Sequence, residues 1–102
     1  MIRGLVVPKE LGEAIEVRLL QWYKAEGDQV AGDEALLEFE TDKAIVLVTA
    51  KQAGTLRRCF FAAGDWMKPG DVAAWLSDGP DEPLPADRNA PAETLEVTFD
   101  TT

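Results

Sequence analysis

The sequence predicts an all-β fold in one small domain. Strand-like runs are short and frequent, and glycine, aspartate and proline residues separate them at close intervals. No stretch carries the apolar spacing of a long helix. The chain has 102 residues, of which 46% are apolar. This composition is enough for a compact domain with a modest core, followed by a tail.

The strands expected in the first part of the chain end at clear turn signals. Pro8 and Gly12 break the chain after the first run, so residues 8–14 are expected to form a loop. The second run alternates apolar with charged side chains, as a half-buried strand does. A turn at Gly27 and another at Gly32 enclose a very short third run. The expected strands are residues 2–7, 15–23, 29–30 and 35–39.

The strands that follow have distinct patterns. Apolar Leu37 and Phe39 alternate with two glutamates, which points two side chains inward and two carboxylates outward. These glutamates are Glu38 and Glu40. The run at 45–49 is apolar on both faces, which predicts a central strand. The remaining strands are expected at residues 53–61, 66–67 and 72–76.

A lysine stands at the tip of a predicted hairpin. The residues that separate its two strands are Glu40, Thr41, Asp42, Lys43 and Ala44. Asp42 suits the turn, because its short carboxylate can hydrogen-bond the local backbone. The β-branched residues beyond Ala44 predict an extended return strand. Lys43 is therefore expected on a narrow, rigid and exposed tip, where it is a candidate attachment point.

The chain contains a faint internal repeat. A shift of 37 residues, which carries Gly27 onto Gly64, aligns similar turn and strand residues in the two halves. The aligned segments are residues 27–30 with 64–67 and residues 36–39 with 73–76. Two half-domains with a similar order of strands and turns are therefore expected. Gly27 is expected to allow a positive φ and Asp28 to close its turn, both structural roles.

The composition changes abruptly at Gly79. Prolines are interleaved there with alanines and acidic residues, at Pro80, Pro83, Pro85 and Pro91. Proline stiffens the chain and removes amide donors. Residues 79–102 are therefore expected to form an extended linker or tail behind a folded domain at residues 1–78. Residues 95–99 have weak strand character without an evident place in the fold.

The charge of the chain argues against several classes of partner. Lysine and arginine number 10 against 19 aspartates and glutamates, so the net charge of −9 repels phosphate backbones and anionic membrane surfaces. No apolar run approaches the ~20 residues of a membrane span. Neither nucleic acid nor a membrane is therefore an expected partner.

The single cysteine, Cys59, cannot close an intramolecular disulfide, which agrees with a reducing compartment inside the cell.

The hairpin and its surroundings carry a family resemblance. The stretch EGDQVAGDEALLEFETDKAIVLV resembles the lipoyl domain of the dihydrolipoyl acyltransferase component of 2-oxo-acid dehydrogenase complexes. The resemblance covers about residues 4–77. It implies a flattened barrel or sandwich of two antiparallel sheets with quasi-two-fold symmetry. It also implies that Lys43 lies at one end of the barrel and the chain termini at the other.

The resemblance further implies a function. Lipoate would be joined to Lys43 by a lipoate ligase or lipoyl transferase, with Glu40, Thr41, Asp42 and Ala44 as recognition context. The arm would take an acyl group from a thiamine-diphosphate-dependent 2-oxo-acid dehydrogenase and pass it to coenzyme A at an acyltransferase core. Dihydrolipoyl dehydrogenase would then reoxidise it. The expected compartment is the bacterial cytoplasm, or the mitochondrial matrix in a eukaryote.

A carrier of this kind needs no acid, base or metal of its own, because the cofactor supplies the chemistry. We therefore predict no catalytic residue and no metal site in this chain, which has no histidine. As given, the chain would be a non-catalytic carrier domain of a dihydrolipoyl acyltransferase whose core lies elsewhere.

Two segments are candidates for partner recognition. The loop containing Leu11, Gly12 and Glu13 resembles the family loop that lies near the lipoyl hairpin and helps to select the dehydrogenase. Here Ala14 replaces the usual glycine. The second candidate is an acidic collar around the hairpin, which could steer the arm toward basic active-site entrances. The collar consists of Glu38, Glu40 and Asp42, and its alternative is a solvated outer face of two strands.

Other functions stay open at this point. Two alternatives are carriers with related folds: a biotin carrier of a carboxylase and a glycine-cleavage-type lipoyl carrier. A third is an unmodified β-sandwich adaptor, in which Lys43 would keep its free amine. Met67 and Lys68 resemble part of a biotinylation motif, but the 37-residue shift places Pro80 where Lys43 stands. The remaining conspicuous residues, Cys59, Trp22, Trp66 and Trp75, are interpreted as core or half-buried packing residues.

Overall fold

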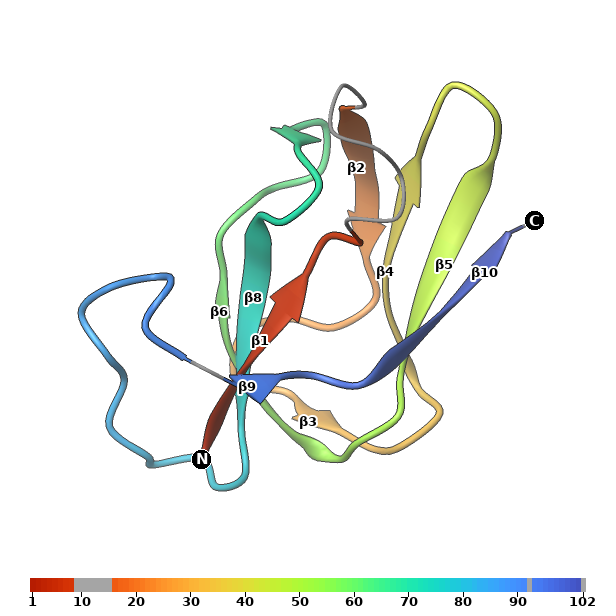
Figure 1. The fold of residues 1–102 in the computed structure, drawn as a ribbon. Coiled ribbons are helices and arrows are strands. Elements are labelled where there is room, and N and C mark those ends of the chain that lie inside the picture. The colour runs from red at the N-terminus through yellow and green to blue at the C-terminus, as the bar shows by residue number, and fades with distance from the viewer. Residues whose placement is uncertain (9–15, 92, 102) are drawn as a thin grey trace.

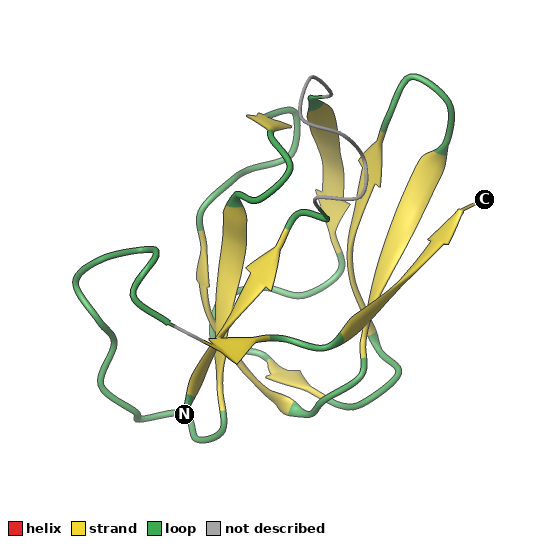
Figure 2. Cartoon of the chain, viewed as in Figure 1, coloured by secondary structure: helices red, strands yellow, loops and turns green. Residues whose placement is uncertain are grey.

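The computed structural model describes residues 1–8, 16–91 and 93–101, and every regular element within them is a strand (Figures 1 and 2). No helix in these ranges is long and apolar enough to cross a membrane. The strands are β1 (Ile2–Val6), β2 (Val17–Trp22), β3 (Gln29–Val30), β4 (Ala35–Glu40), β5 (Ile45–Ala50), β6 (Gly54–Cys59), β7 (Trp66–Met67), β8 (Val72–Ser77), β9 (Glu93–Thr94) and β10 (Val97–Thr101). The strands expected from the sequence up to residue 76 are all present, with ends that differ by a few residues.

The strands form two sheets with orders β3-β6-β8-β1-β9 and β10-β5-β4-β2-β7. Neighbouring strands are antiparallel in every pair except β1 and β9, which run parallel. The apolar faces of both sheets meet in one core. The predicted all-β architecture of two sheets is therefore confirmed.

The two sheets are related by the predicted quasi-two-fold symmetry. Exchanging β1 with β5, β2 with β6, β3 with β7, β4 with β8 and β9 with β10 converts one sheet order into the other. Even the irregular positions repeat. Leu36 of β4 is skipped in the pairing with β5, Ala73 of β8 is skipped in the pairing with β1, and the 37-residue shift relates the two residues. The internal repeat is therefore a structural one.

The turns repeat with the same shift. Gly27 and Gly64 have φ angles of 96° and 94°, in the left-handed region that glycine adopts without strain. In each turn an aspartate carboxylate accepts a hydrogen bond from the amide three residues before it, at 2.9 Å and 2.8 Å. These aspartates are Asp28 and Asp65, so the structural roles predicted for Gly27 and Asp28 are confirmed.

The alternation predicted around Phe39 is also present. Leu37 and Phe39 are buried, whereas Glu38 and Glu40 are partly exposed. Strand β5 differs from its prediction, because only one of its faces is buried and Ile45 is exposed. It is nevertheless an inner strand, since β4 pairs with one of its edges and β10 with the other.

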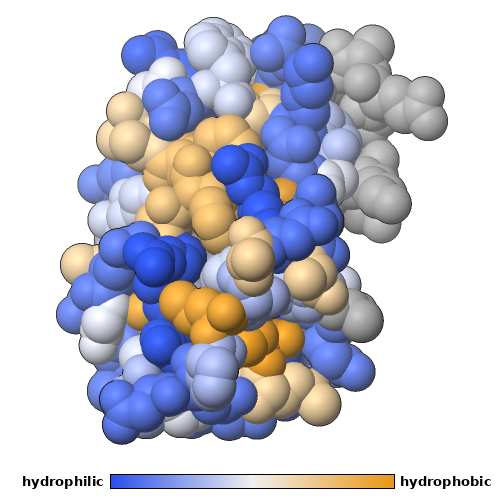
Figure 3. Space-filling view, turned by 90° about the vertical axis from the view of Figure 1, so that its left-hand side faces the viewer, coloured by the Kyte–Doolittle hydropathy of each residue, from blue (hydrophilic) through white to orange (hydrophobic). Residues whose placement is uncertain are grey.

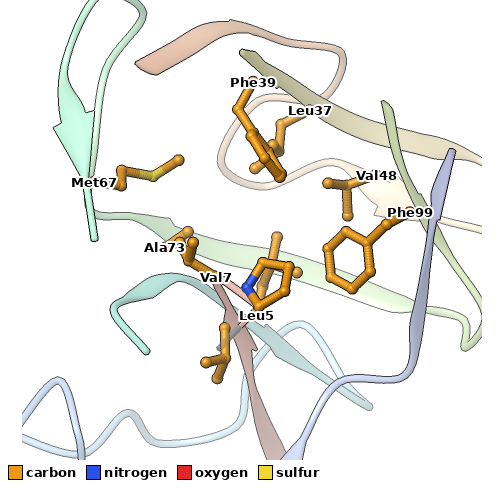
Figure 4. Close-up of a pocket in the computed structure, with 10 residues that line it drawn as sticks. Leu5, Val7, Leu37, Phe39, Val48, Met67, Ala73 and Phe99 are labelled. Atoms are coloured by element: carbon orange, nitrogen blue, oxygen red, sulfur yellow. The ribbon is translucent and has the colours of Figure 1, made fainter. Parts of the chain in front are cut away.

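The end of the chain corrects the expectation of an extended linker for residues 93–101. β9 adds to the edge of β1, and β10 adds to the edge of β5. Between them Leu95 is only 2% exposed, and its amide donates to the carbonyl of Gly4 at 2.8 Å. Figure 4 shows Phe99 of β10 beside Val48, facing the same interior space as the core side chains from both sheets. This segment is therefore integral to the described fold.

Residues 79–91 lie against the outer face of the sheet that contains β6 and β8, as the blue loop of Figure 1 shows. Arg57 donates to the carbonyl of Glu82 at 2.9 Å, and the indole of Trp75 donates to the carbonyl of Arg88 at 3.1 Å. The Arg88 guanidinium lies 4.7 Å from the ring centre of Phe60. Figure 3 shows this side of the molecule, where apolar groups remain at the surface between hydrophilic ones.

The positions of the two chain ends correct a second expectation. Met1 lies at the end of the molecule opposite the β4–β5 hairpin, as expected (Figure 1). The C-terminal strand instead runs back toward that hairpin, because Thr101 pairs with Val46 near the start of β5. Residues 97–101 therefore lie beside the strand that carries the lysine tip.

Candidate functional site

The candidate site is the tip that joins β4 to β5. The two strands stay paired up to their ends, where Glu40 lies opposite Ile45. One backbone hydrogen bond closes the tip, from the amide of Thr41 to the carbonyl of Ala44 at 2.9 Å. Asp42 and Lys43 are exposed beyond this bond. The predicted narrow, exposed hairpin tip is present.

The hydroxyl of Thr41 organises the tip. Its oxygen accepts hydrogen bonds from the amides of Lys43 and Ala44, both at 3.1 Å, and the hydroxyl is also 3.3 Å from the carbonyl oxygen of Ala44. Asp42 was predicted to hold the turn, but the side-chain hydrogen bonds described at this tip are those of Thr41. A threonine that bonds the amides two and three residues ahead is a recognised turn former, and this signal was available in the sequence.

The tip leaves the Lys43 amine accessible for chemistry. Among the described residues the amine of Lys43 forms no ion pair, whereas Lys24 pairs with Glu34 at 2.9 Å. An exposed primary amine held at a defined point can be converted to an amide by an enzyme that activates a carboxylic acid. Small Ala44 and short Asp42 flank it and leave room for such an enzyme.

The acidic collar surrounds one side of this tip. Asp42 is exposed, and Glu38 and Glu40 are partly exposed on the outer face of β4. The amide nitrogen of Gln21 lies 3.4 Å from the Glu38 carboxylate and 2.8 Å from the Tyr23 hydroxyl. Outward carboxylates therefore run along β4 from Glu38 to the tip that carries Lys43.

The other predicted recognition residues, Leu11, Gly12 and Glu13, lie outside the described residues. Lys68, the rival modification site, lies in the turn between β7 and β8, where its amide donates to the Asp71 carboxylate at 2.9 Å. Pro80 lies in the turn after β8, the position equivalent to the lysine tip in the second half. The two halves are therefore alike in backbone, but only the first presents a lysine at its hairpin tip.

Cys59 is partly buried and packs against the core, as its interpretation as a packing residue requires. Burial, together with the nearby negative charge of Glu26, raises the pKa of the Cys59 thiol to about 11. The thiol is therefore protonated at neutral pH, and only a thiolate is a strong nucleophile.

This pKa predicts slow alkylation of Cys59. A rise from 9.0 to about 11 lowers the thiolate fraction at pH 7 by about 100-fold, so iodoacetamide should react far more slowly with the folded domain than with the urea-unfolded chain. The rate should climb with pH up to about 11. Mass spectrometry of timed samples measures this. Equal rates for the folded and unfolded chains would contradict the assignment.

The tryptophans do not all pack as expected. Trp75 is buried, and Trp22 is half-buried with its indole donating to the carbonyl of Phe61 at 2.9 Å. Trp66 is 59% exposed, so its interpretation as a core or half-buried residue is wrong. Its position on the two-residue edge strand β7 explains why, because only Met67 of that strand points into the core.

Comparisons with known proteins identify the family of this chain. The biotin and lipoyl family model described as "Biotin-requiring enzyme" matches residues 5–76. The chain is 37% identical over 90 residues to the dihydrolipoyllysine-residue succinyltransferase component of the 2-oxoglutarate dehydrogenase complex of Bacillus subtilis, a match that covers 84% of this chain and 22% of that protein. It is 39% identical over 79 residues to the dihydrolipoyllysine-residue acetyltransferase component of the pyruvate dehydrogenase complex of Corynebacterium glutamicum, covering 76% of this chain and 12% of that protein.

A solved structure is also similar. The solution structure of the lipoyl domain of the 2-oxoglutarate dehydrogenase complex of Azotobacter vinelandii matches with a TM-score of 0.67 and 27% identity. The match covers 76% of this chain and 98% of that domain. The chain thus spans nearly all of a known lipoyl domain but at most about a quarter of the curated relatives described above.

Proposed function

Because this chain belongs to the biotin and lipoyl attachment family and has the fold of a lipoyl domain, we propose that it is a swinging-arm carrier with lipoate in amide linkage on Lys43. The observation that carries the proposal is the accessible Lys43 amine at the closed β4–β5 tip, inside the matched range. When bound, lipoate supplies a cyclic disulfide that can accept an acyl group and two electrons.

The residues of the chain itself hold and present the attachment point. The pairing of Glu40 with Ile45 and the Thr41 hydrogen bonds fix where the tip places the Lys43 backbone. The rigid strands behind the tip position it, while the long lysine side chain supplies reach. Cys59, kept protonated and partly buried, is a poor partner for exchange with a disulfide carried on the same domain.

We propose partners on the same basis. The relatives are named as components of 2-oxoglutarate and pyruvate dehydrogenase complexes. This chain would therefore exchange its group with a thiamine-diphosphate-dependent 2-oxo-acid dehydrogenase, an acyltransferase core and dihydrolipoyl dehydrogenase. A lipoate ligase or lipoyl transferase would load it.

Reductive acylation tests the carrier role. The lipoylated domain and free lipoamide are compared as substrates of a purified 2-oxo-acid dehydrogenase that recognises lipoyl domains of this type. The domain should be acylated with a much higher kcat/KM, because the enzyme can bind the domain as well as the arm. If the domain were no better a substrate than free lipoamide for the 2-oxoglutarate, pyruvate and branched-chain enzymes, the carrier proposal would be wrong.

Replacing Thr41 with valine should slow lipoylation while leaving the domain folded. Valine keeps the shape of threonine but cannot accept the amides of Lys43 and Ala44. The loss of these two hydrogen bonds, one exposed and one partly buried, should cost about 1 kcal/mol of unfolding free energy. The initial rate of a lipoate ligase reaction should fall several-fold, and Thr41→Ser should restore it. Full activity of the valine variant would show that the hydroxyl does not organise the tip.

A further inference from the structure

Trp66 is a large aromatic side chain that the fold leaves in solvent. It lies on β7, the edge strand of the second sheet, and pairs with Arg18 of β2. Its neighbour Met67 is 1% exposed and points into the core, so alternation along the strand directs Trp66 outward. Exposed tryptophan gains nothing from the hydrophobic effect unless something covers it.

The quasi-two-fold symmetry shows that the fold does not require this tryptophan. In the other half, β3 pairs with β6 as β7 pairs with β2, and the residue equivalent to Trp66 is Gln29. The inward residues of these strands, Val30 and Met67, are both buried and apolar. The fold therefore demands an apolar side chain only at the inward position. It does not require a tryptophan at position 66, so the exposed indole is available for a contact outside the domain.

Trp66 belongs to a row of outward side chains that ends at the lysine hairpin. Trp66 pairs with Arg18, Arg18 pairs with Glu40, and Glu40 pairs with Ile45. We call these four residues the Trp66 row. With strands about 4.8 Å apart, the row spans about 14 Å across the sheet. At its far end Ile45 is 38% exposed and lies two residues from Lys43.

The equivalent row on the other sheet is closed by the chain itself. It consists of Gln29, Thr55, Ser77 and Ile2, which carry no charge. Thr55 and Ser77 are only 3% and 1% exposed. The Ser77 hydroxyl accepts a hydrogen bond from Arg57 and donates one to the carbonyl of Gly79, the first residue of the segment that covers this face. Residues 79–91 thus cover one face, whereas Trp66 and Ile45, at the two ends of the Trp66 row, are 59% and 38% exposed.

The charges around the Trp66 row favour a basic partner surface. Glu40 lies in the row, Glu38 lies next to it on the same face of β4, and Asp42 is at the tip. Arg18 is the basic member of the row, and amide formation removes the charge of Lys43. One lysine or arginine of a basic partner patch can lie over the exposed indole, while another pairs with the carboxylates nearer the tip.

We propose that the Trp66 row is a docking surface for a basic patch beside the active-site entrance of the 2-oxo-acid dehydrogenase that acylates the arm. This inference rests on the proposed carrier function. The row is continuous with the lysine tip, so an enzyme that reaches the arm from this side meets it. An acyltransferase centre needs such a docking surface less. The relatives are themselves acyltransferases, so the centre lies on the same chain as the matched domain and meets it at high effective concentration.

Trp66→Gln, which installs the residue of the equivalent position, tests the proposal, and Gln29→Ala is its matched control. For the lipoylated domain, the KM of reductive acylation should rise about tenfold in Trp66→Gln with little change in kcat, whereas Gln29→Ala should stay within about twofold. Binding of the unlipoylated domains to immobilised dehydrogenase is the second readout, and Trp66→Gln should weaken it by a similar factor. Both variants should melt close to the wild-type temperature, since both side chains are exposed.

The outcomes separate this inference from the proposed function. If wild type is acylated well and Trp66→Gln shows unchanged KM and binding, the docking inference is wrong and the carrier function stands. If the substitution slows only reoxidation by dihydrolipoyl dehydrogenase, the row docks a different occupant and the inference is likewise wrong. If wild type is no better than free lipoamide, the carrier function fails and the inference falls with it.

Discussion

A chain that ends at residue 91 is expected to lose about 3–5 kcal/mol of unfolding free energy, a large share of what a small domain possesses. The truncation removes Leu95, whose full burial is worth about 2 kcal/mol, and uncovers core side chains beneath Phe99. It also opens the edges of β1 and β5 by removing their ladders with β9 and β10. The melting temperature should fall by about 15 °C or more.

Two substitutions make this prediction specific. Leu95→Ala should reproduce about half of the loss by leaving a cavity at a buried position. Asp100→Ala, on an exposed position of β10, should stay within about 0.5 kcal/mol of the full chain. Thermal denaturation followed by circular dichroism compares all the proteins. A truncated chain that melts within a few degrees of the full chain would show that residues 93–101 are an accessory tail.

Inserting one glycine between Asp42 and Lys43 is expected to reduce the lipoylation rate by about 100-fold without unfolding the domain. The insertion displaces the amine from its position and breaks the Thr41 pattern, which depends on bonds two and three residues ahead. Displacements of about 1 Å at a reacting group can cost two orders of magnitude in rate. The exposed tip itself makes no core contact, so stability should change little.

The matched control is a variant with one glycine inserted between Ala86 and Asp87, both exposed in the segment after β8. It should be lipoylated at the wild-type rate. Ligase rates and circular dichroism are measured on the same samples. Undiminished lipoylation of the tip insertion would mean that the ligase recognises the local sequence and not the geometry of the hairpin.

Local signals explain how much of the fold could be predicted. Gly27 and Gly64 stand where the backbone needs positive φ, and their following aspartates cap the turns, so the repeat was visible from few identities. Asp33, with φ 72°, takes the place that Gly70 occupies in the other half. Aspartate is among the few residues that tolerate this conformation, so the repeat continues there without identity.

Non-local pairing explains what could not be predicted. β9 and β10 form strands because they pair with the edges of β1 and β5. These partner strands lie far away in the sequence, so local patterns do not reveal the pairing. The proline content around them suggested a linker instead. At the site, the lysine tip was predicted, but the role of Thr41 was assigned to Asp42. The exposure of Trp66 was missed because apolar content alone does not say which face of an edge strand a residue occupies.

The most direct test of the central claim is the mapped mass of the domain after incubation with a lipoate ligase. The account predicts one added lipoyl group, located on Lys43 by peptide mapping, and none on Lys43→Arg, since a guanidinium cannot form the amide under these conditions. The variant should melt like wild type, because the side chain is exposed. Biotin ligase should leave the wild-type domain largely unmodified. A lipoyl group mapped to Lys51 or Lys68, or efficient biotinylation of Lys43 without lipoylation, would contradict the account.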